Sequence, residues 1–383
     1  MKLDKKYYPM LAMLGGIVLL IIILMVVFLF MNSGKKTYQY VENQMMKAAQ
    51  QYYSKKPSEL PKKIGEETKI NTSTLINENY MKEFSEYNEN YVCSGEVAVL
   101  KTAKAYNYVP LLDCGESYKT KFLVDVLLEE LVTKENGLYA FDEAAKPSGK
   151  ILSLDEEGND LSKNPLLGGY VYRGKEVNNF ILIDKIKYRI SKIDKNNDLQ
   201  ITSFSNLLTN NYFDKSYNSD RGYNYGYNDY QRSEVRQKLI KHFNGFDDKS
   251  LTKQLAVPKD ICVGGRTSDD KGSDGTLECS KVISGEYISL LPMFDLMNAS
   301  LDEKCSTTLS PECSNYNYLI DNKIRAFTLT PNLTDSSQVY HHSGIIKASR
   351  ASINSSISYT IFISKYAVYV SGTGSEEDPY IIK

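Results

Sequence analysis

The sequence has no excess of charge of either sign. Its 383 residues carry 46 Lys and Arg against 47 Asp and Glu, which gives a formal net charge of −1, and no long basic run follows the first six residues. A protein that binds nucleic acid needs a basic surface to neutralise phosphates. The composition therefore disfavours a nucleic-acid partner, and the length allows about two globular domains.

Catalytic signatures are also missing. The chain contains no G-x-S-x-G, H-E-x-x-H or P-loop pattern. Only His242, His341 and His342 are available as imidazole bases. We therefore expect no enzyme activity, no catalytic residue and no cofactor. A cell-envelope enzyme is the alternative, and it would need a pocket in which a carboxylate meets His341 or His342.

A long apolar run lies near the start of the chain. Residues 9–31 contain no charged side chain, and at about 1.5 Å per helical residue they span the roughly 30 Å hydrocarbon core of a bilayer. The alternative is a cleaved signal peptide, whose apolar region is shorter and ends at small residues. This run ends in Phe28-Leu29-Phe30-Met31. We therefore predict an uncleaved anchor in contact with membrane lipid, preceded by a cytoplasmic tail at residues 1–8.

Cysteine is scarce, and its spacing is informative. The six cysteines fall into three close couples, Cys93 and Cys114, Cys262 and Cys279, Cys305 and Cys313. Such couples indicate local disulfides formed in an oxidising compartment. The first couple also lies nearly equidistant from the turn between two strand-like runs, as residues facing each other across a hairpin do. Metal binding or free thiols are the alternative, but no C-x₂-C spacing occurs. The chain after the anchor is therefore predicted to be extracellular.

A helix is predicted directly after the anchor. Apolar residues recur at helical spacing from Tyr38 to Tyr52, and Lys55-Lys56-Pro57 ends the pattern. We expect this helix to leave the bilayer as a stalk. With the hairpin it makes a small α+β module at residues 35–131. That module resembles the layout of type IV pilins and pseudopilins, without the glycine and glutamate of the prepilin cleavage motif.

A polar linker or irregular lead-in is predicted at residues 132–167, and a β-rich domain at residues 168–383. The motifs of this domain resemble, in their fixed order, a family of uncharacterised surface proteins of Gram-positive bacteria. They are Gly168–Gly174, Asp260–Arg266, Met297–Asp302, Cys313–Leu319 and Ser371–Ile382. The C-terminal part of that family is similar to the C-type-lectin-like fold, in the branch shared with formylglycine-generating enzymes. The resemblance implies such a fold here and no particular activity.

Two acidic segments are weak calcium candidates. Asp194-x-Asn196-x-Asp198 begins like a calcium loop but lacks the later glycine and glutamate that such a loop needs. A polar β-turn is the better interpretation. Inside the second cysteine loop, Asp269, Asp270 and Asp274 offer further oxygen ligands, although turn chemistry explains them equally well.

Tyrosine is abundant although tryptophan is absent. The chain has 30 Tyr, and several of them lie among Asn, Asp, Gly and Ser between residues 212 and 230. Tyrosine supplies rigid contact area at a low cost in entropy, as in binding loops. We therefore expect this segment to bind an extracellular glycan or protein through Tyr217, Tyr223, Tyr225, Tyr227 and Tyr230. The alternative is an ordered loop whose rings cover the core.

Together these predictions describe an α+β protein. It would consist of an N-terminal transmembrane helix, a stalk helix with a small pilin-like module, and a mostly β, C-type-lectin-like domain. The predicted function is non-catalytic adhesion or ligand binding at the outer face of the cell membrane. A structural component of a pilus-like or secretion assembly is the alternative.

Overall fold

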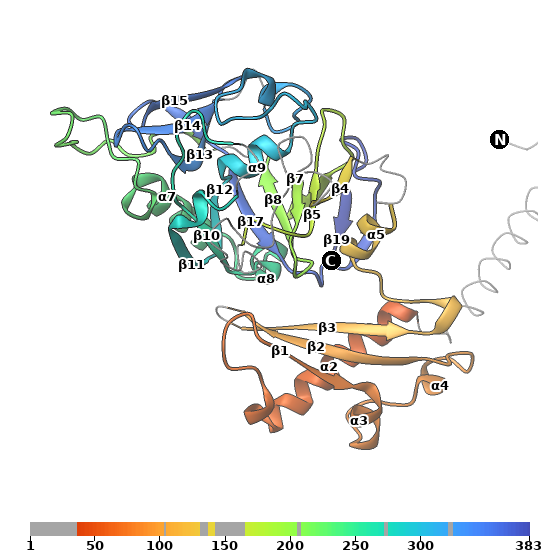
Figure 1. Cartoon of the computed structure of the whole chain (residues 1–383). Helices are drawn as coiled ribbons and strands as arrows, with labels where there is room; N and C mark the ends of the chain where they lie inside the picture. The colour runs from red at the N-terminus through yellow and green to blue at the C-terminus, as the bar shows by residue number, and fades with distance from the viewer. Residues whose placement is uncertain are drawn as a thin grey trace, which may run out of the picture. The chain divides into compact units, whose positions relative to one another are not determined.

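The computed structural model divides into two compact units (Figure 1). It describes residues 37–102, 105–130, 137–141, 165–204, 208–271, 275–320 and 325–383. The N-terminal unit ends at Thr120, and the C-terminal unit comprises Lys121–Lys383 together with a short loop at Thr102–Ala105. The predicted tail and membrane anchor at residues 1–31 lie outside the described residues, as does most of the predicted linker.

In the N-terminal unit, one helix covers a face of a small antiparallel sheet (Figure 1). Helix α2 (Tyr38–Lys55) packs against β2 (Ser94–Lys101) and β3 (Tyr106–Asp113), and β1 (Glu67–Asn71) completes the sheet. The helix begins where the Thr37 hydroxyl accepts a hydrogen bond from the first turn. Its predicted apolar face is buried. That face packs on the sheet, so the helix and the hairpin belong to one unit.

The predicted hairpin and its disulfide are confirmed. Ser94 pairs with Asp113 at the open end of the β2–β3 hairpin. The Cys93–Cys114 bridge lies directly beside this pair, with Cα atoms 4.1 Å apart. The other helical elements of this unit are short: η2 (Pro57–Glu59), α3 (Thr72–Asn77), α4 (Phe84–Tyr87) and η3 (Gly115–Ser117).

A nine-stranded sheet forms the centre of the described C-terminal unit. Along its main path the order is β12-β17-β8-β7-β6-β19-β18, while β5 joins β7 and β4 joins β5. Strand β19 inserts parallel to β6, and the other pairings are antiparallel. The strands are β4 (Leu138–Ala140), β5 (Tyr170–Tyr172), β6 (Phe180–Ile183), β7 (Ile186–Ile193), β8 (Leu199–Ser203), β12 (Ile288–Leu290), β17 (Tyr359–Ile363), β18 (Tyr369–Ser371) and β19 (Tyr380–Ile382). Strand β4 lies within the segment predicted as a linker.

A five-stranded sheet, ordered β15-β14-β13-β16-β9, and a ribbon of β10 and β11 complete the β-structure of the described C-terminal unit. The strands are β9 (Leu208–Asn211), β10 (Lys259–Cys262), β11 (Val282–Glu286), β13 (Ala326–Pro331), β14 (Gln338–His342), β15 (Ile346–Arg350) and β16 (Ser355–Ile357). The helical elements are α5 (Leu123–Glu130), η6 (Tyr230–Arg232), α7 (Glu234–Asn244), α8 (Leu251–Leu255), η7 (Glu278–Ser280), α9 (Met293–Asn298) and η8 (Pro311–Ser314). Helix α7 begins where the Ser233 hydroxyl accepts a hydrogen bond from the Arg236 amide at 3.2 Å.

The predicted α+β class is wrong for the described chain, which is mostly β with few helices. The predicted transmembrane helix lies outside the described residues, and the pilin-like and lectin-like resemblances stay predictions. The two longest helices within it, α2 and α7, have 18 and 11 residues. None of the described helices is both long and apolar enough to cross a membrane. The physical reason is that turns interrupt the chain at short intervals. Asp184 and Lys185, for example, both take positive φ between β6 and β7, as a tight hairpin turn requires.

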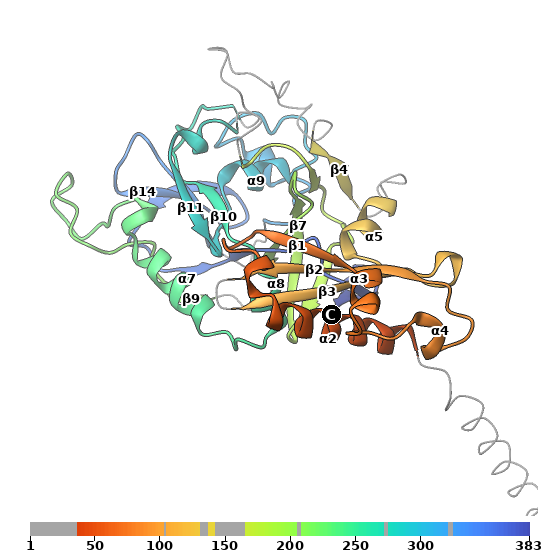
Figure 2. The same ribbon diagram turned by 90° about the horizontal axis from the view of Figure 1, so that it is seen from below.

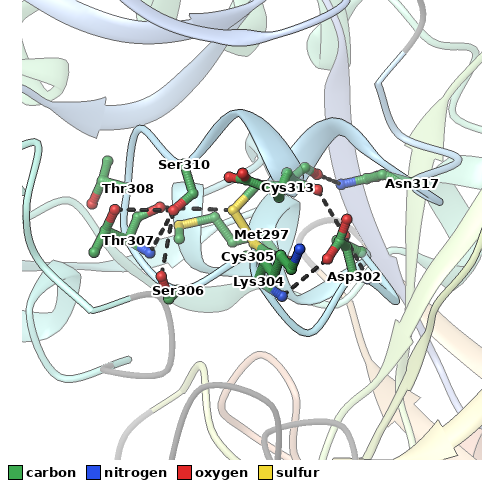
Figure 3. The surroundings of a disulfide bond; sticks show 12 residues. Met297, Asp302, Lys304, Cys305, Ser306, Thr307, Thr308, Ser310, Cys313 and Asn317 are labelled. Carbon is green, nitrogen blue, oxygen red and sulfur yellow. Dashed lines mark hydrogen bonds between the residues drawn. A yellow bond between two sulfur atoms is a disulfide. The ribbon is translucent and has the colours of Figure 1, made fainter.

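The other two predicted disulfides are also confirmed, and they close neighbouring loops. The Cα atoms are 4.4 Å apart in both Cys262–Cys279 and Cys305–Cys313. The amides of Thr308 and Leu309, in the loop closed by Cys305–Cys313, donate to carbonyl oxygens of the other loop. Beside this bridge, the Asn317 side chain donates to the Cys313 carbonyl at 2.9 Å (Figure 3). The two covalent loops therefore brace each other.

A fully buried ion pair ties the Cys262–Cys279 loop to the core. Arg266 Nε lies 2.7 Å from Glu278 Oε1, and the exposed fraction of both side chains is 0%. The same carboxylate oxygen accepts a hydrogen bond from the Phe294 amide at 2.9 Å. Glycine at Gly264 permits this close packing, because a Cβ there would lie 2.6 Å from the Leu277 carbonyl oxygen. Burial raises the pKa of Glu278, and Arg266 opposes that rise.

Loss of the arginine is expected to destabilise the protein strongly. The variant Arg266→Met leaves an uncompensated buried carboxylate, so its free energy of unfolding should fall by about 3–5 kcal/mol. Arg232→Met is the matched control: Arg232 pairs with Asp229, but its side chain is 76% exposed, so the loss should be about 1 kcal/mol or less. Urea unfolding followed by circular dichroism measures both.

A second substitution tests the cause of that loss. Adding Glu278→Gln to Arg266→Met removes the uncompensated charge, while the amide oxygen can still accept from Phe294, so part of the stability should return. Equal stability losses in Arg266→Met and Arg232→Met would contradict this role for the buried pair.

Candidate functional site

The segment with the predicted ligand-binding tyrosines, residues 212–230, is the green loop that extends away from the sheets at the left of Figures 1 and 2. We call it the tyrosine loop. Its two ends are held in the core. Phe213 is fully buried, and its amide donates to the Ala351 carbonyl at 2.9 Å. Tyr230, at the other end, is 1% exposed and contacts the Phe213 ring, with 6.2 Å between the ring centroids. The loop therefore leaves and re-enters the core at neighbouring points.

Hydrogen bonds within the tyrosine loop fix its shape. The Asp214 carboxylate accepts from the Tyr227 amide at 2.8 Å and from the Ser216 hydroxyl at 2.7 Å. The buried Asn218 side chain donates to the Gly226 carbonyl at 2.7 Å. Gly226 has a φ of 73°, and a side chain there would collide with the Asp214 carbonyl. The polar residues of the loop thus cap its own backbone.

The connection between β13 and β14 braces the tyrosine loop from outside. The Asn228 amide group donates to three backbone carbonyls of this connection at 2.8–3.0 Å. These carbonyls belong to Asn332, Asp335 and Gln338. The Arg221 guanidinium lies 2.6 Å from the Asp335 carboxylate. Partial burial alone would raise the pKa of Asp335, but hydrogen bonds from Ser337 and Arg221 hold that pKa below its usual value. The ion pair therefore persists at neutral pH.

Two tyrosines of the loop present their rings to solvent. Tyr217 and Tyr223 are 61% and 62% exposed. Tyr223 stacks on Tyr225, with ring centroids 5.1 Å apart and planes 24° apart. The Arg350 guanidinium, at the end of β15, lies 3.8 Å from the centroid of the Tyr225 ring. We call Tyr223, Tyr225 and Arg350 the aromatic platform. The Tyr223 ring is thus stacked on Tyr225 and exposed to solvent. This geometry suits stacking against a sugar ring or an aromatic side chain.

The five predicted tyrosines thus occupy three different environments. Tyr217 and Tyr223 are exposed, whereas Tyr225 lies within the aromatic platform and Tyr227 shares a hydrogen bond of 2.8 Å with the Ser219 hydroxyl. Tyr230 packs in the core, as in the alternative in which loop tyrosines cover it. The sequence carries no signal for Arg350, because it reaches the loop from a strand far along the chain.

The first calcium candidate is a polar turn, as predicted. Asp194 and Asp198 lie at the β7–β8 turn, where the Asp194 amide donates to the Asp198 carbonyl and Asn197 has a φ of 67°. The ammonium group of Lys259 lies 2.6 Å from a carboxylate oxygen of each aspartate. A lysine therefore supplies the positive charge that these carboxylates face.

The second calcium candidate is described only in part. The Asp270 carboxylate accepts from the Thr267 amide at 2.6 Å, and Asp269 accepts from the Ser268 hydroxyl at 3.3 Å. Both carboxylates thus take part in turn hydrogen bonds. Asp274 lies outside the described residues. Among the residues that are described, no three His, Cys, Asp or Glu side chains are placed together to hold a metal ion.

A serine and a histidine meet on neighbouring strands. His341 Nε2 lies 2.7 Å from the Ser349 hydroxyl. Burial lowers the pKa of His341 to about 4, which makes it a weak base. Its Nδ1 is buried and has no hydrogen-bond partner in the described chain, so the group that would orient the imidazole in a catalytic triad is missing there. This pair acts as a cross-strand hydrogen bond.

Comparison with known proteins gives no match: no protein-family model, curated protein or solved structure is significantly similar to the chain. The predicted resemblance to a bacterial surface-protein family stays a prediction. A function for the tyrosine loop is therefore inferred from its geometry alone.

Removal of the Asn228 side chain is expected to loosen the tyrosine loop. In Asn228→Ala, three buried or partly buried carbonyls of the β13–β14 connection keep their backbone donors but lose the side-chain donor that joins them to the loop. Local opening of the loop should then become easier by about 1–2 kcal/mol. Amide exchange at residues 216–227 should then become about tenfold faster. Asn315→Ala, which removes a hydrogen bond to Asp302 at an exposed loop, is the control and should leave that exchange unchanged. Equal exchange in the two variants would show that Asn228 does not brace the loop.

Proposed function

We propose that this chain is a non-catalytic binding protein that displays the tyrosine loop outside the cell. The observation that carries the proposal is the exposure of Tyr217 and Tyr223 on a loop whose backbone is fixed by its own hydrogen bonds. A rigid loop loses little conformational entropy when it binds, so aromatic area on it is effective in recognition.

The chemistry of the loop favours a ligand with both flat apolar faces and hydrogen-bonding groups. The exposed Tyr223 ring offers a stacking surface, and the neighbouring Asp220 and Arg221 carry charge in the middle of the same loop. Sugar rings of a glycan have such faces and hydroxyl groups. A protein surface with an exposed aromatic residue has them as well, and both classes belong in the test.

The cysteines and the apolar run support the extracellular location in this proposal. All six cysteines are bridged, and disulfides of this kind persist in oxidising compartments. The apolar run at residues 9–31 is of the length that a single membrane crossing needs. We place its N-terminal side in the cytoplasm and both described units outside, attached to the membrane.

Truncation of the exposed tyrosines is expected to weaken binding. Tyr217→Ala and Tyr223→Ala should each raise the dissociation constant about tenfold or more, as loss of an exposed aromatic anchor does. Tyr316→Ala is the matched control, because Tyr316 is 64% exposed in the same unit but lies outside the loop, and it should bind like the unaltered protein. The measurement is binding of residues 35–383 to immobilised bacterial cell-surface glycans and to surface proteins.

Two results would contradict the proposal. The first is equal binding by the Tyr217, Tyr223 and Tyr316 variants, which would move the site away from the tyrosine loop. The second is the absence of any bound glycan or protein together with turnover of a cell-wall substrate, which would make the chain an enzyme.

A further inference from the structure

We infer that the N-terminal unit carries a second contact surface, which rests on the outer leaflet of the membrane that anchors the chain. This interfacial patch consists of Tyr38, Tyr40, Tyr91, Val92 and Tyr118. The inference rests on the membrane anchoring in the proposed function. It adds that the end of the N-terminal unit that carries this patch faces the lipid.

The interfacial patch is a stack of rings beside an exposed apolar residue. Tyr38 lies between Tyr91 and Tyr118, with ring centroids 4.5 and 4.4 Å apart and nearly parallel planes. Val92 is 89% exposed and Tyr40 is 38% exposed. Val92 directly precedes Cys93, whose disulfide holds this stretch of chain to the end of the hairpin. Its exposure is therefore built into the fold.

The length of the tether places this patch close to the bilayer. The apolar run ends at Met31 and α2 begins at Tyr38, so the seven connecting steps reach at most about 25 Å. Headgroups occupy roughly the first 5–8 Å outside the hydrocarbon core. Tyr38 therefore lies within about 25 Å of the hydrocarbon core, which lets the rings stacked on it reach the headgroup layer.

The opposite end of the same unit lies farther from the tether. Ile64 is 48% exposed, and the adjacent Gly65 amide donates to the carbonyl of Lys101, the last residue of β2. Val92 lies just before the first residue of that strand. Eight residues of β-strand extend about 25 Å, so Ile64 and Val92 mark the two ends of the sheet.

The chemistry of the patch suits a bilayer interface. Tyrosine is enriched at the headgroup level because its ring is apolar and its hydroxyl is polar. Charges of both signs flank the patch: Lys35 and Lys36 precede Tyr38 in the sequence, Glu86 and Glu89 are exposed, and Lys119 is paired with Asp113 at 3.4 Å. The contact should therefore depend on apolar and aromatic burial and not on lipid charge.

A single tryptophan tests the inference directly, because the chain contains none of its own. The full chain is reconstituted into phosphatidylcholine vesicles that contain lipid brominated near the headgroup. Val92→Trp should show blue-shifted emission and quenching several-fold stronger than Ile64→Trp, its control in the same unit. Both positions are exposed, so neither variant disturbs the core, and circular dichroism with peptide mapping checks the fold and the disulfides.

The outcomes separate this inference from the anchoring on which it rests. If the chain floats with the vesicles but Val92→Trp is as weakly quenched as Ile64→Trp, the anchoring holds and the interfacial patch is refuted. If the chain does not float with the vesicles, the anchoring is contradicted, and the inference that the patch contacts lipid is contradicted as well. Strong quenching of Ile64→Trp alone would show that the other end of the unit faces the lipid.

Discussion

Short covalent loops hold the hairpin of the N-terminal unit and two loops of the C-terminal unit in place. The three bridges close loops with sequence separations of 21, 17 and 8 residues, and a loop of about 15 residues can gain roughly 3 kcal/mol from closure by restricting the unfolded chain. One bridge fixes the hairpin end that carries Val92. Another closes the loop that contains both Arg266 and Glu278, which form a fully buried ion pair. The third lies in a loop that donates hydrogen bonds to the second. The same chemistry also implies an oxidising compartment, on which the proposed location depends.

Buried polar side chains stabilise the tyrosine loop, which contains no disulfide. Between Phe213 and Tyr230 the tyrosine loop buries no apolar side chain. Asn218 and Asp214 form hydrogen bonds with its own backbone, while Asn228 holds it to the β13–β14 connection. A buried carbonyl without a donor costs free energy, and each such contact therefore favours one loop shape. In that loop conformation the Tyr223 ring stacks on Tyr225 and remains exposed to solvent. The proposed binding surface therefore depends on hydrogen bonds to the backbone of the loop and not on a hydrophobic core beneath it.

Local features of this fold could be predicted from the sequence. Helix α2 follows from its apolar period and the Lys55-Lys56-Pro57 stop, and the Cys93–Cys114 pairing follows from a symmetric hairpin. Non-local features could not. Strand β19 pairs with β6, and Arg350 reaches Tyr225, across long stretches of chain, because β pairing and loop bracing depend on tertiary contacts that no local pattern encodes. The β-rich domain was predicted, and the fold class was mistaken because the helical period near the start of the chain was given too much weight beside the many strands.

The state of the six cysteines in the protein taken from cells is the most direct test of this account. Free thiols are first blocked by alkylation, and the unreduced protein is then digested and its peptides are mapped. The account predicts three bridged peptides, which join Cys93 to Cys114, Cys262 to Cys279 and Cys305 to Cys313, with no alkylated cysteine. Alkylation at all six positions would place the chain in a reducing compartment. The extracellular location, and the binding function that depends on it, would then be contradicted.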